Sequence, residues 1–587
     1  MKKKFSRREM LKLMALTTAG AIVAACQPSS SGPSGPAAPT DTTAPKEEAT
    51  TAPKEEEKAT EAPKVEPTVE KPTATPQVGD VDPGYYNLAD FESLTNKKIT
   101  QFKQSPFLDA RVASGELPPV EKRLPENPLV FRTLDHIGEY SGTLRFDAII
   151  TTGDWHLRHI NAANNIEMPP SPAWDVVSTV FGYPMQPGLL ESFSMSPDGM
   201  VFTGTIRRGL KWSDGTPVTT ADVEFRIKDI LLNKELNPVP APWLVWGGGE
   251  TELVIIDSQT FQYKFAAPYG AFINAEIAMW PGTYYKLIYP AHWLKQYHKD
   301  YADEATLLAA MKEAELTSMD EWRTFFGSKL GLFGCDNTFM DTGGKEFPTV
   351  NPYIIKEDQG NGNYLLERNP YFYMIDQEGN QLPYIDKLQR TYLADSEMQD
   401  LSIIAGNTDM SCMSISIDSY PLYKENETKG NFVALPLSAW QDQIFITIMN
   451  EWAGIKPPLL KSVGMTPPEN PPDDSVYDPG ISEVYHDVRF RRAMSMALDR
   501  DVFNESLFLG LGRPAQGAPR PGTPFYKEGM EEAWAQYDPE AAKALLDEMG
   551  MVVGADGWRV RPDGKPFVMK YEYFVITGAS TRMKPTR

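Results

Sequence analysis

The stretch SPDGMVFTGTIRRGLKWSDGTPVTTADVEF, residues 196–225, decides the fold class. Its turn dipeptides Asp198-Gly199 and Asp214-Gly215 enclose an apolar, β-branched run at 201–206 that predicts a strand. Residues 209–212 are predicted to be the returning strand of the same hairpin. The segment therefore begins as β structure.

The second half of this segment predicts a helix. Thr219 precedes Asp222 by three residues, the spacing of a capping box, in which both side chains accept hydrogen bonds from free N–H groups of the first turn. Apolar residues then follow at helical intervals and give the helix one buried face: they are Val223, Ile227, Ile230 and Leu231.

Helices and strands alternate along the rest of the chain. Asp487 is predicted to cap a helix whose apolar stripe continues to Val502 and ends at Gly510. Another helix is predicted between a capping Asp538 and Gly550, where a left-handed residue suits the end of the helix. Strand-like runs lie at 255–265, 364–368, 444–449 and 567–573. This mixture predicts an α/β fold.

Length and charge limit the class of protein. The chain has 587 residues, more than one compact core usually holds, so we expect two or more lobes. A net charge of −22 opposes contact with nucleic-acid phosphates, and we expect no nucleic-acid partner. Three cysteines exclude a four-thiolate zinc module, and six histidines leave few ligands for a metal enzyme. We expect no metal and no other cofactor.

Residues 1–26 have the pattern of an export signal. A basic start precedes the apolar run Leu13–Ala25, which is too short to span a bilayer. Ser6–Lys12 resembles the twin-arginine export motif, and Val23-Ala24-Ala25-Cys26 resembles a lipobox. We therefore expect an extracytoplasmic lipoprotein that acyl chains on Cys26 anchor to the cell membrane, in the periplasmic space or on the outer face of the cytoplasmic membrane.

Residues 27–80 are predicted to form a disordered stalk. The segment has ten prolines, no aromatic residue, no Leu or Ile, and a repeated Thr-Ala-Pro-Lys-Glu-Glu unit at 43–48 and 51–56. Such a composition buries too little apolar area to offset the entropy of ordering the chain. Proline stiffens it locally toward polyproline II, so the stalk acts as a semi-rigid spacer.

The segment at 196–223 resembles the signature of bacterial extracellular solute-binding proteins of family 5, which are the oligopeptide-, dipeptide- and nickel-binding components of ABC importers. Four further segments agree with that family in the same order along the chain: Ile137–Leu144, Tyr364–Phe372 with its Glu367-Arg368-Asn369-Pro370 tetrad, His486–Arg500 and Tyr537–Gly550. The resemblance extends over roughly 130–570.

This resemblance implies a class II periplasmic-binding-protein fold with two lobes joined by a hinge. Residues 81–450 are then the first lobe with its family-type insertion, and 451–587 are the start of the second lobe. The chain is expected to cross between the lobes near Asn450. Because the family's second lobe continues well past the strand at 567–573, the resemblance also implies an incomplete second lobe and a chain truncated at its C-terminus.

A receptor that closes on its ligand needs polar groups to recognise the ligand and flat apolar surfaces to desolvate it. We predict cleft residues in the loop after the first strand, in the run 440–450 and before a triple glycine: Trp155, Trp440, Gln441, Gln443, Phe445, Asn450, Trp243 and Trp246. Gln441, Gln443 and Phe445 share one face of a strand because side chains alternate. Each tryptophan is also compatible with an ordinary core position.

Two functions remain open. The first is a membrane-tethered receptor, not an enzyme, that binds a peptide-like, oligosaccharide-like or other small solute and delivers it to ABC permease subunits. The alternative is a tethered hydrolase of oligosaccharides or peptides. The sequence has no phosphate-binding G-x-x-x-x-G-K-[ST] motif and no G-x-S-x-G nucleophile elbow. Carboxylate spacing selects no catalytic pair, and the pairing of Cys335 with Cys412 stays open.

Overall fold

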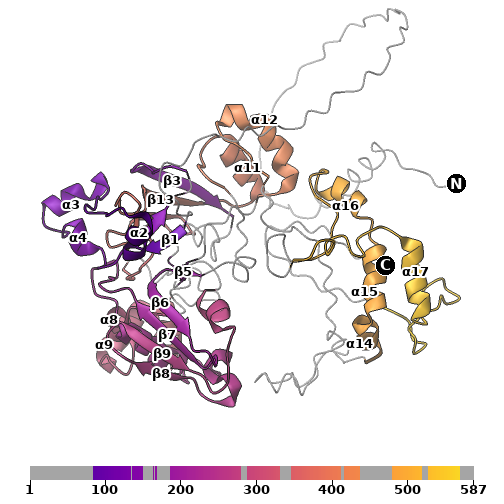
Figure 1. Ribbon diagram of the computed structural model, residues 1–587, viewed down its shortest axis with the longest axis horizontal. Helices are drawn as coiled ribbons and strands as arrows, with labels where there is room; N and C mark the ends of the chain where they lie inside the picture. Colours follow the sequence, from indigo (N-terminus) through magenta and orange to yellow (C-terminus); the bar gives the residue numbers. More distant parts are fainter. Residues whose placement is uncertain are drawn as a thin grey trace, which may run out of the picture. The chain divides into compact units, whose positions relative to one another are not determined.

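The computed structural model describes ten parts of the chain (Figure 1): residues 84–133, 135–149, 163, 166–167, 185–278, 287–330, 346–411, 415–436, 479–518 and 526–568. The chain divides into two units, 1–74 and 75–587, and all described residues belong to the second unit. The predicted signal and stalk lie outside the described residues, as does the strand predicted at 444–449.

The signature segment contributes the centre of an antiparallel sheet. Four strands pair in the order β6-β7-β9-β8; they are β6 (Leu190–Met195), β7 (Val201–Ile206), β8 (Glu252–Ile255) and β9 (Thr260–Lys264). The strand predicted at 201–206 is confirmed as β7. Of the run predicted as a strand at 255–265, residues 260–264 form β9, whereas 256–259 form the turn that joins β9 to β8.

The return strand predicted at 209–212 is wrong. The neighbours of β7 are β6 and β9, and of residues 209–212 only Lys211 makes a bridge, to Pro217. Gly209 has a φ of +76°, and the Leu210 amide donates to the Arg207 carbonyl oxygen at 3.1 Å, which closes a turn directly after β7. The chain leaves the sheet there instead of folding back along it.

The capping box is confirmed. Thr219 caps α7 (Thr220–Phe225), which continues as one π-helical turn, η2 (Arg226–Leu231). One oxygen of Asp222 accepts from the Thr219 amide and the other from the Ala291 amide, each at 3.0 Å, so that α8 (Ala291–Leu294) is tied to the start of α7. The predicted apolar face is buried except at Leu231, which is half-buried.

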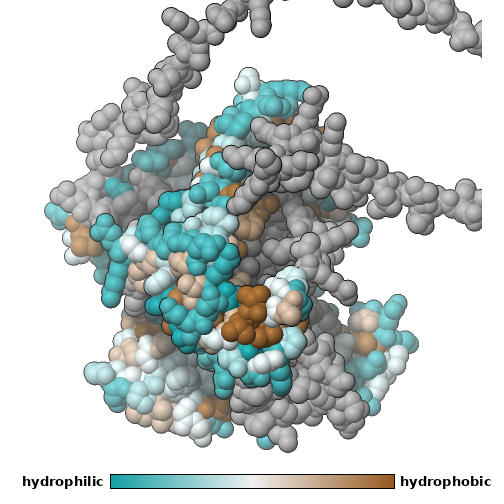
Figure 2. All heavy atoms as spheres, turned by 90° about the vertical axis from the view of Figure 1, so that its right-hand side faces the viewer, coloured by the Kyte–Doolittle hydropathy of each residue, from teal (hydrophilic) through white to brown (hydrophobic). Residues whose placement is uncertain are grey.

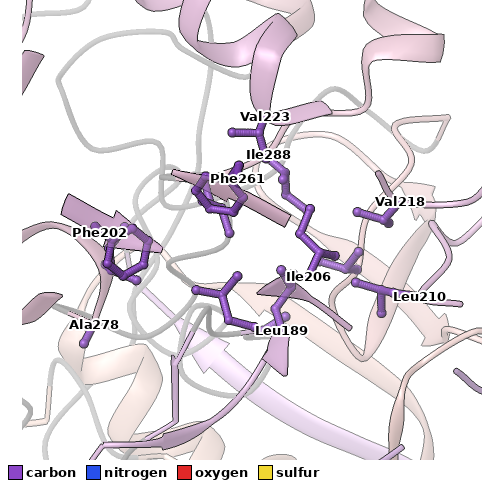
Figure 3. Packing of buried hydrophobic residues seen from close by; sticks show 14 of the residues in the cluster. Leu189, Phe202, Ile206, Leu210, Val218, Val223, Phe261, Ala278 and Ile288 are labelled. Carbon is purple, nitrogen blue, oxygen red and sulfur yellow. The ribbon is translucent and has the colours of Figure 1, made fainter. Parts of the chain in front are cut away.

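The largest core lies between this sheet and its helices. Side chains of the signature segment, including Phe202, Ile206 and Val223, point toward Leu189 and Phe261 (Figure 3). Burying a side chain of this size stabilises a protein by about 1.5–3 kcal/mol, so the segment is a major source of stability. A second core, built on Leu307, Met311, Trp322, Phe325 and Phe326, holds α9 (Glu304–Glu313) and α10 (Trp322–Leu330).

Two further sheets contain parallel pairs. In the first, β1 (Gly84–Asn87) is antiparallel and β12 (Met374–Asp376) parallel to β2 (Leu129–Arg132). The second has the order β10-β11-β13-β3, with β3 (Ser141–Ala148), β10 (Tyr353–Asp358), β11 (Tyr364–Arg368) and β13 (Ile385–Tyr392). Here β3 and β13 are parallel, and the strand predicted at 364–368 is confirmed as β11.

Short elements connect these sheets. They are the two-stranded β4 (Ile166–Glu167) and β5 (Gln186–Pro187), the helices α2 (Leu88–Thr95), α3 (Asp109–Ala113), α4 (Val120–Arg123), α11 (Ser396–Ile404) and α12 (Tyr420–Gly430), and the single turns η1 (Pro106–Leu108), η3 (Pro242–Gly248), η4 (Ile273–Ile277), η6 (Lys295–Tyr297), η7 (Met319–Glu321) and η8 (Ile417–Ser419).

Residues 479–568 form cores of their own, in which Phe490 and Met551 are buried. The helices are α14 (Pro479–His486), α15 (Val488–Met496), α16 (Arg500–Leu507) and α17 (Pro539–Glu548). Asp538 caps α17 and Gly550 has a φ of +77°, as predicted. Apolar side chains at Val552, Val553 and Trp558 are exposed, and Figure 2 shows strongly hydrophobic atoms at the surface of the face that it presents.

The helix predicted from Asp487 to Gly510 is two helices. Asp487 caps α15, but α15 ends at Met496, and Asp499 starts α16 by accepting a hydrogen bond from the Val502 amide at 3.1 Å. The second cap separates the two apolar faces, and Val502 is 58% exposed. A capping aspartate inside an apolar stripe therefore indicates the start of a new helix more strongly than the stripe indicates one continuous helix.

Candidate functional site

Most of the predicted cleft residues fall outside the described residues, and their roles stay predictions. They are Trp155, Trp440, Gln441, Gln443, Phe445 and Asn450. Cys26, Cys335 and Cys412 also fall outside the described residues. The structure describes Trp243 and Trp246 and the strands next to the predicted Trp155 loop, and the site is built from these.

Trp243 and Trp246 do not share a surface. Trp243 is 7% exposed, with its ring 5.3 Å from that of Tyr263 in the largest core. Trp246 is 36% exposed and stacks on Tyr269, with ring centroids 3.9 Å apart and an interplanar angle of 8°. The backbone of η3 leaves helical geometry at Val245 and Trp246, so a spacing of three does not place both rings on one face.

Trp246 is held rigidly on this surface. Its Nε1 donates to the Pro268 carbonyl oxygen at 3.0 Å, and Tyr269 packs beneath its ring. The Tyr269 hydroxyl donates to Glu276 at 3.2 Å. An exposed indole fixed in this way suits stacking on a sugar or peptide plane, and its contact with a ligand remains a prediction.

A second candidate surface is the edge at which the parallel strands β3 and β13 end. In open α/β sheets, ligands bind outside the carboxyl ends of parallel strands. The paired strands end together at Ala148 and Tyr392, and the Leu393 amide donates to the Ala148 carbonyl oxygen at 2.8 Å. The predicted Trp155 follows β3 in the sequence, and its position at this edge stays a prediction.

Carboxylates lie at the end of β3. Asp147 is 3% exposed, and its carboxylate accepts a hydrogen bond from the Thr408 hydroxyl. Two residues earlier in β3, Arg145 pairs with Asp409 at 2.6 Å, and the Arg145 amide donates to the same carboxylate at 2.7 Å. Hydrogen bonds from Arg145 hold the pKa of Asp409 below its ordinary value. Asp409 is therefore an ionised and fixed group at neutral pH.

Helix α11 begins at the same edge. Asp395 caps it by accepting from the Met398 amide at 2.8 Å, shortly after β13 ends. The buried Gln399 donates to the Ser411 hydroxyl at 3.3 Å, and Asp400 accepts from Ser419 at 2.7 Å, which joins α11 to the chain leading into α12. Sequence reasoning missed these residues, although Asp395 before Met398 has N-cap spacing.

The motifs that carry the family resemblance make structural contacts. Asp222 ties α7 to α8, as described above. Arg368 is fully buried and pairs with Asp386 at 2.9 Å, and the neighbouring Asn369 amide donates to the Asn351 carbonyl oxygen at 2.9 Å. Arg489 pairs with Asp487 at 2.7 Å at the start of α15. These motif residues maintain the fold.

The described residues show neither a metal site nor a membrane-spanning helix. In that part of the chain, no three His, Cys, Asp or Glu side chains gather as a metal site. Within the same residues, no helix has the length and apolar character that crossing a membrane requires.

Comparisons with known proteins agree with this fold. Residues 184–583 match the family model described as bacterial extracellular solute-binding proteins, family 5 Middle. The solved structure of an oligopeptide-binding protein OppA is similar with a TM-score of 0.59 and 29% identity, covering 82% of this chain and 69% of that one. The predicted periplasmic-binding-protein type of fold, two-lobed and α/β, is thereby confirmed.

Two curated proteins are also similar. A periplasmic alpha-galactoside-binding protein of Rhizobium meliloti (strain 1021) is 25% identical over 484 residues, which are 78% of this chain and 60% of that protein. A probable ABC transporter-binding protein of Deinococcus radiodurans is 24% identical over 440 residues, 72% of this chain and 62% of that protein. This chain thus spans less than two thirds of the length of both relatives.

Proposed function

Because the chain belongs to the bacterial extracellular solute-binding proteins of family 5, we propose that it is a receptor that captures a small solute outside the cytoplasm and delivers it to the permease of an ABC importer. The observation that carries this proposal is the family match over residues 184–583. The relatives reported above are binding proteins rather than enzymes, which supports a receptor over a hydrolase.

The proposed mechanism is closure of two lobes on the solute. Residues 81–450 form the first lobe and 451–587 belong to the second, with the hinge near Asn450. The separate cores of residues 479–568 support this division. Ligand stabilises the closed form in proportion to its differential affinity for that form, and the closed form docks on the permease.

The carboxyl edge of β3 and β13 is the proposed floor of the ligand site on the first lobe. Buried Asp147 and the ion pair of Arg145 with Asp409 give this edge fixed charges, and the Trp155 loop follows it. Rigid polar groups beside an aromatic ring suit a polar solute such as a short oligosaccharide or peptide. The alpha-galactoside- and oligopeptide-binding relatives name these same two classes.

The proposed location follows from the first 80 residues. Cys26 carries the lipid anchor at the membrane, and the proline-rich stalk 27–80 gives the lobes reach toward the permease.

Intrinsic tryptophan fluorescence of the purified chain tests the proposal. We expect a saturable change with one of two probes, raffinose or trialanine, and mass spectrometry should recover that probe chemically unchanged. A chain that hydrolyses either probe is an enzyme, which would refute the receptor. Absence of any saturable response to a panel of oligosaccharides and di- to pentapeptides would refute solute binding by this chain.

A further inference from the structure

Arg132, the last residue of β2, is a buried cation with no counter-ion among the residues that the structure describes. Its side chain is 7% exposed, and Nη1 donates to the carbonyl oxygen of the adjacent Thr133 at 3.0 Å. Its Nε is buried and has no hydrogen-bond partner. Among the residues that the structure describes, no Asp or Glu forms an ion pair with it. A buried guanidinium normally has several acceptors, because desolvating a charge is costly.

Arg368 also has a buried Nε without a hydrogen-bond partner, but its guanidinium pairs with Asp386 at 2.9 Å. Arg207 follows the rule more fully. Arg207 is fully buried and donates to the carbonyl oxygens of Gly188 and Asn127 and to the side chain of Asn87. The Gln377 amide beside Thr133 is already used, since its Oε1 accepts from the Thr133 amide at 2.9 Å and its Nε2 donates to the Thr133 hydroxyl at 3.0 Å. Both of these Gln377 hydrogen bonds go to Thr133, and neither reaches Arg132.

A second unused donor lies at the same corner of the sheet. Arg132 is paired in register with Gly84 of β1, so the two residues face the same side of the sheet. A Cβ at Gly84 would lie 2.9 Å from Nε2 and 3.0 Å from Oε1 of Gln186, so the Gln186 amide occupies the space that a side chain at 84 would fill. Its Oε1 accepts from the Tyr85 amide at 2.9 Å, and Nε2 remains a donor. In Figure 1, β1 and β5 lie side by side.

We propose that Arg132 and Gln186 form an oxyanion-binding site at the Gly84 corner of the β1-β2-β12 sheet. The ligand is a carboxylate or phosphate group, because a guanidinium fork binds planar or tetrahedral oxyanions through two N–H groups. The oxyanion is either a free inorganic ion or the acidic group of a solute. The site belongs to the β1-β2-β12 sheet, whereas the carboxyl edge of β3 and β13 belongs to a different sheet.

Thermal unfolding of the purified chain in inorganic phosphate, at ionic strength held constant with sodium chloride, tests the site. We expect a saturable rise in Tm of about 1–2 °C at ten times the dissociation constant. The second part of the test compares the Tm in galacturonate with the Tm in galactose, since only galacturonate has a carboxylate. A response to phosphate indicates a free ion, and a response to galacturonate alone indicates the acidic group of a solute.

Two variants keep the test independent of folding defects. Arg132→Met removes an unpaired buried charge, so this variant should abolish the response to the oxyanion without lowering the Tm in chloride. The control variant Arg207→Met should lower the Tm in chloride strongly. Gln186→Glu keeps the acceptor for Tyr85 and places a carboxylate beside Arg132, so it should raise the Tm in chloride and abolish the response. The proposal is overturned if neither phosphate nor galacturonate acts on the wild-type chain, or if the response survives in both variants.

Discussion

Replacing Asp222 with alanine should destabilise the signature segment more than any change on the exposed side of its helix. Asp222 is buried, and its two carboxylate oxygens accept hydrogen bonds from the Thr219 and Ala291 amides, each at 3.0 Å. The Ala291 amide is itself buried and has no water to replace the lost acceptor. The variant therefore loses both the helix cap and the contact between α7 and α8.

The size of the effect follows from these two bonds. A hydrogen bond to a charged group contributes about 1.5–3 kcal/mol, so two give about 3–6 kcal/mol. Burial raises the pKa of Asp222, despite hydrogen bonds from the Thr219 and Ala291 amides, which shows that the ionised form bears a desolvation cost. Removing the charge recovers part of this cost, and we expect a net loss of about 3 kcal/mol.

Urea unfolding followed by far-UV circular dichroism measures this loss. The matched control is Glu224→Ala on the same helix, where Glu224 makes an exposed pair with Lys228 at 2.6 Å and should contribute no more than about 0.5 kcal/mol. If Asp222→Ala costs no more than this control, the capping box does not support the core, and the structural role assigned to the motif is wrong.

Three further outcomes are expected. Burial lowers the pKa of His298 below 6.5, although the Asp229 carbonyl and Asp300 oppose the shift. The unfolded chain therefore takes up a proton that the folded chain does not, and the free energy of unfolding should fall as the pH drops below about 6.5. Urea midpoints measured between about pH 5 and 7.5 should show this fall in the wild-type chain. The fall in the urea midpoint should be smaller in His298→Gln, which lacks the titrating ring. Cys26→Ser should move the exported protein from the membrane to the soluble fraction on immunoblots, and equal membrane retention would refute the anchor. Trp155→Ala should remove most of the ligand-induced fluorescence change, whereas Trp246→Ala should preserve ligand affinity if the site lies at the edge of β3 and β13; the opposite result would move the site to the Trp246 surface.

Local signals in the sequence located individual elements well. The strand at 201–206 and the caps at Thr219, Asp487 and Asp538 appear in the structure at the predicted residues. Each of these elements depends on side chains and backbone groups that lie within a few residues of one another, so the local sequence pattern is enough to predict it. Errors arose where one local signal competes with another, as when Asp499 ends the stripe that began at Asp487.

Pairing between distant strands could not be predicted in this way. Ser141 lies beside Ile385 in the parallel pair of β3 and β13, a contact between residues more than two hundred positions apart. The proposed site at the end of these strands depends on that pairing and on Thr408, whose hydroxyl donates to Asp147 from a third segment. Trp243 and Trp246 show the same limit on a smaller scale, because the departure of η3 from helical geometry separates their rings.

The motif residues that carry the family resemblance make contacts within the chain. Asp222, Arg368 and Arg489 are fixed by amides, carbonyl oxygens and carboxylates of this chain. Such contacts preserve the fold whatever the lobes enclose, because their partners belong to the protein itself. Solute choice must then depend on groups whose hydrogen bonds are not all used within the chain. Arg132 differs from Arg368, whose Nε is also unpartnered, because no Asp or Glu among the described residues pairs with Arg132, and this makes Arg132 the informative residue for the proposed oxyanion.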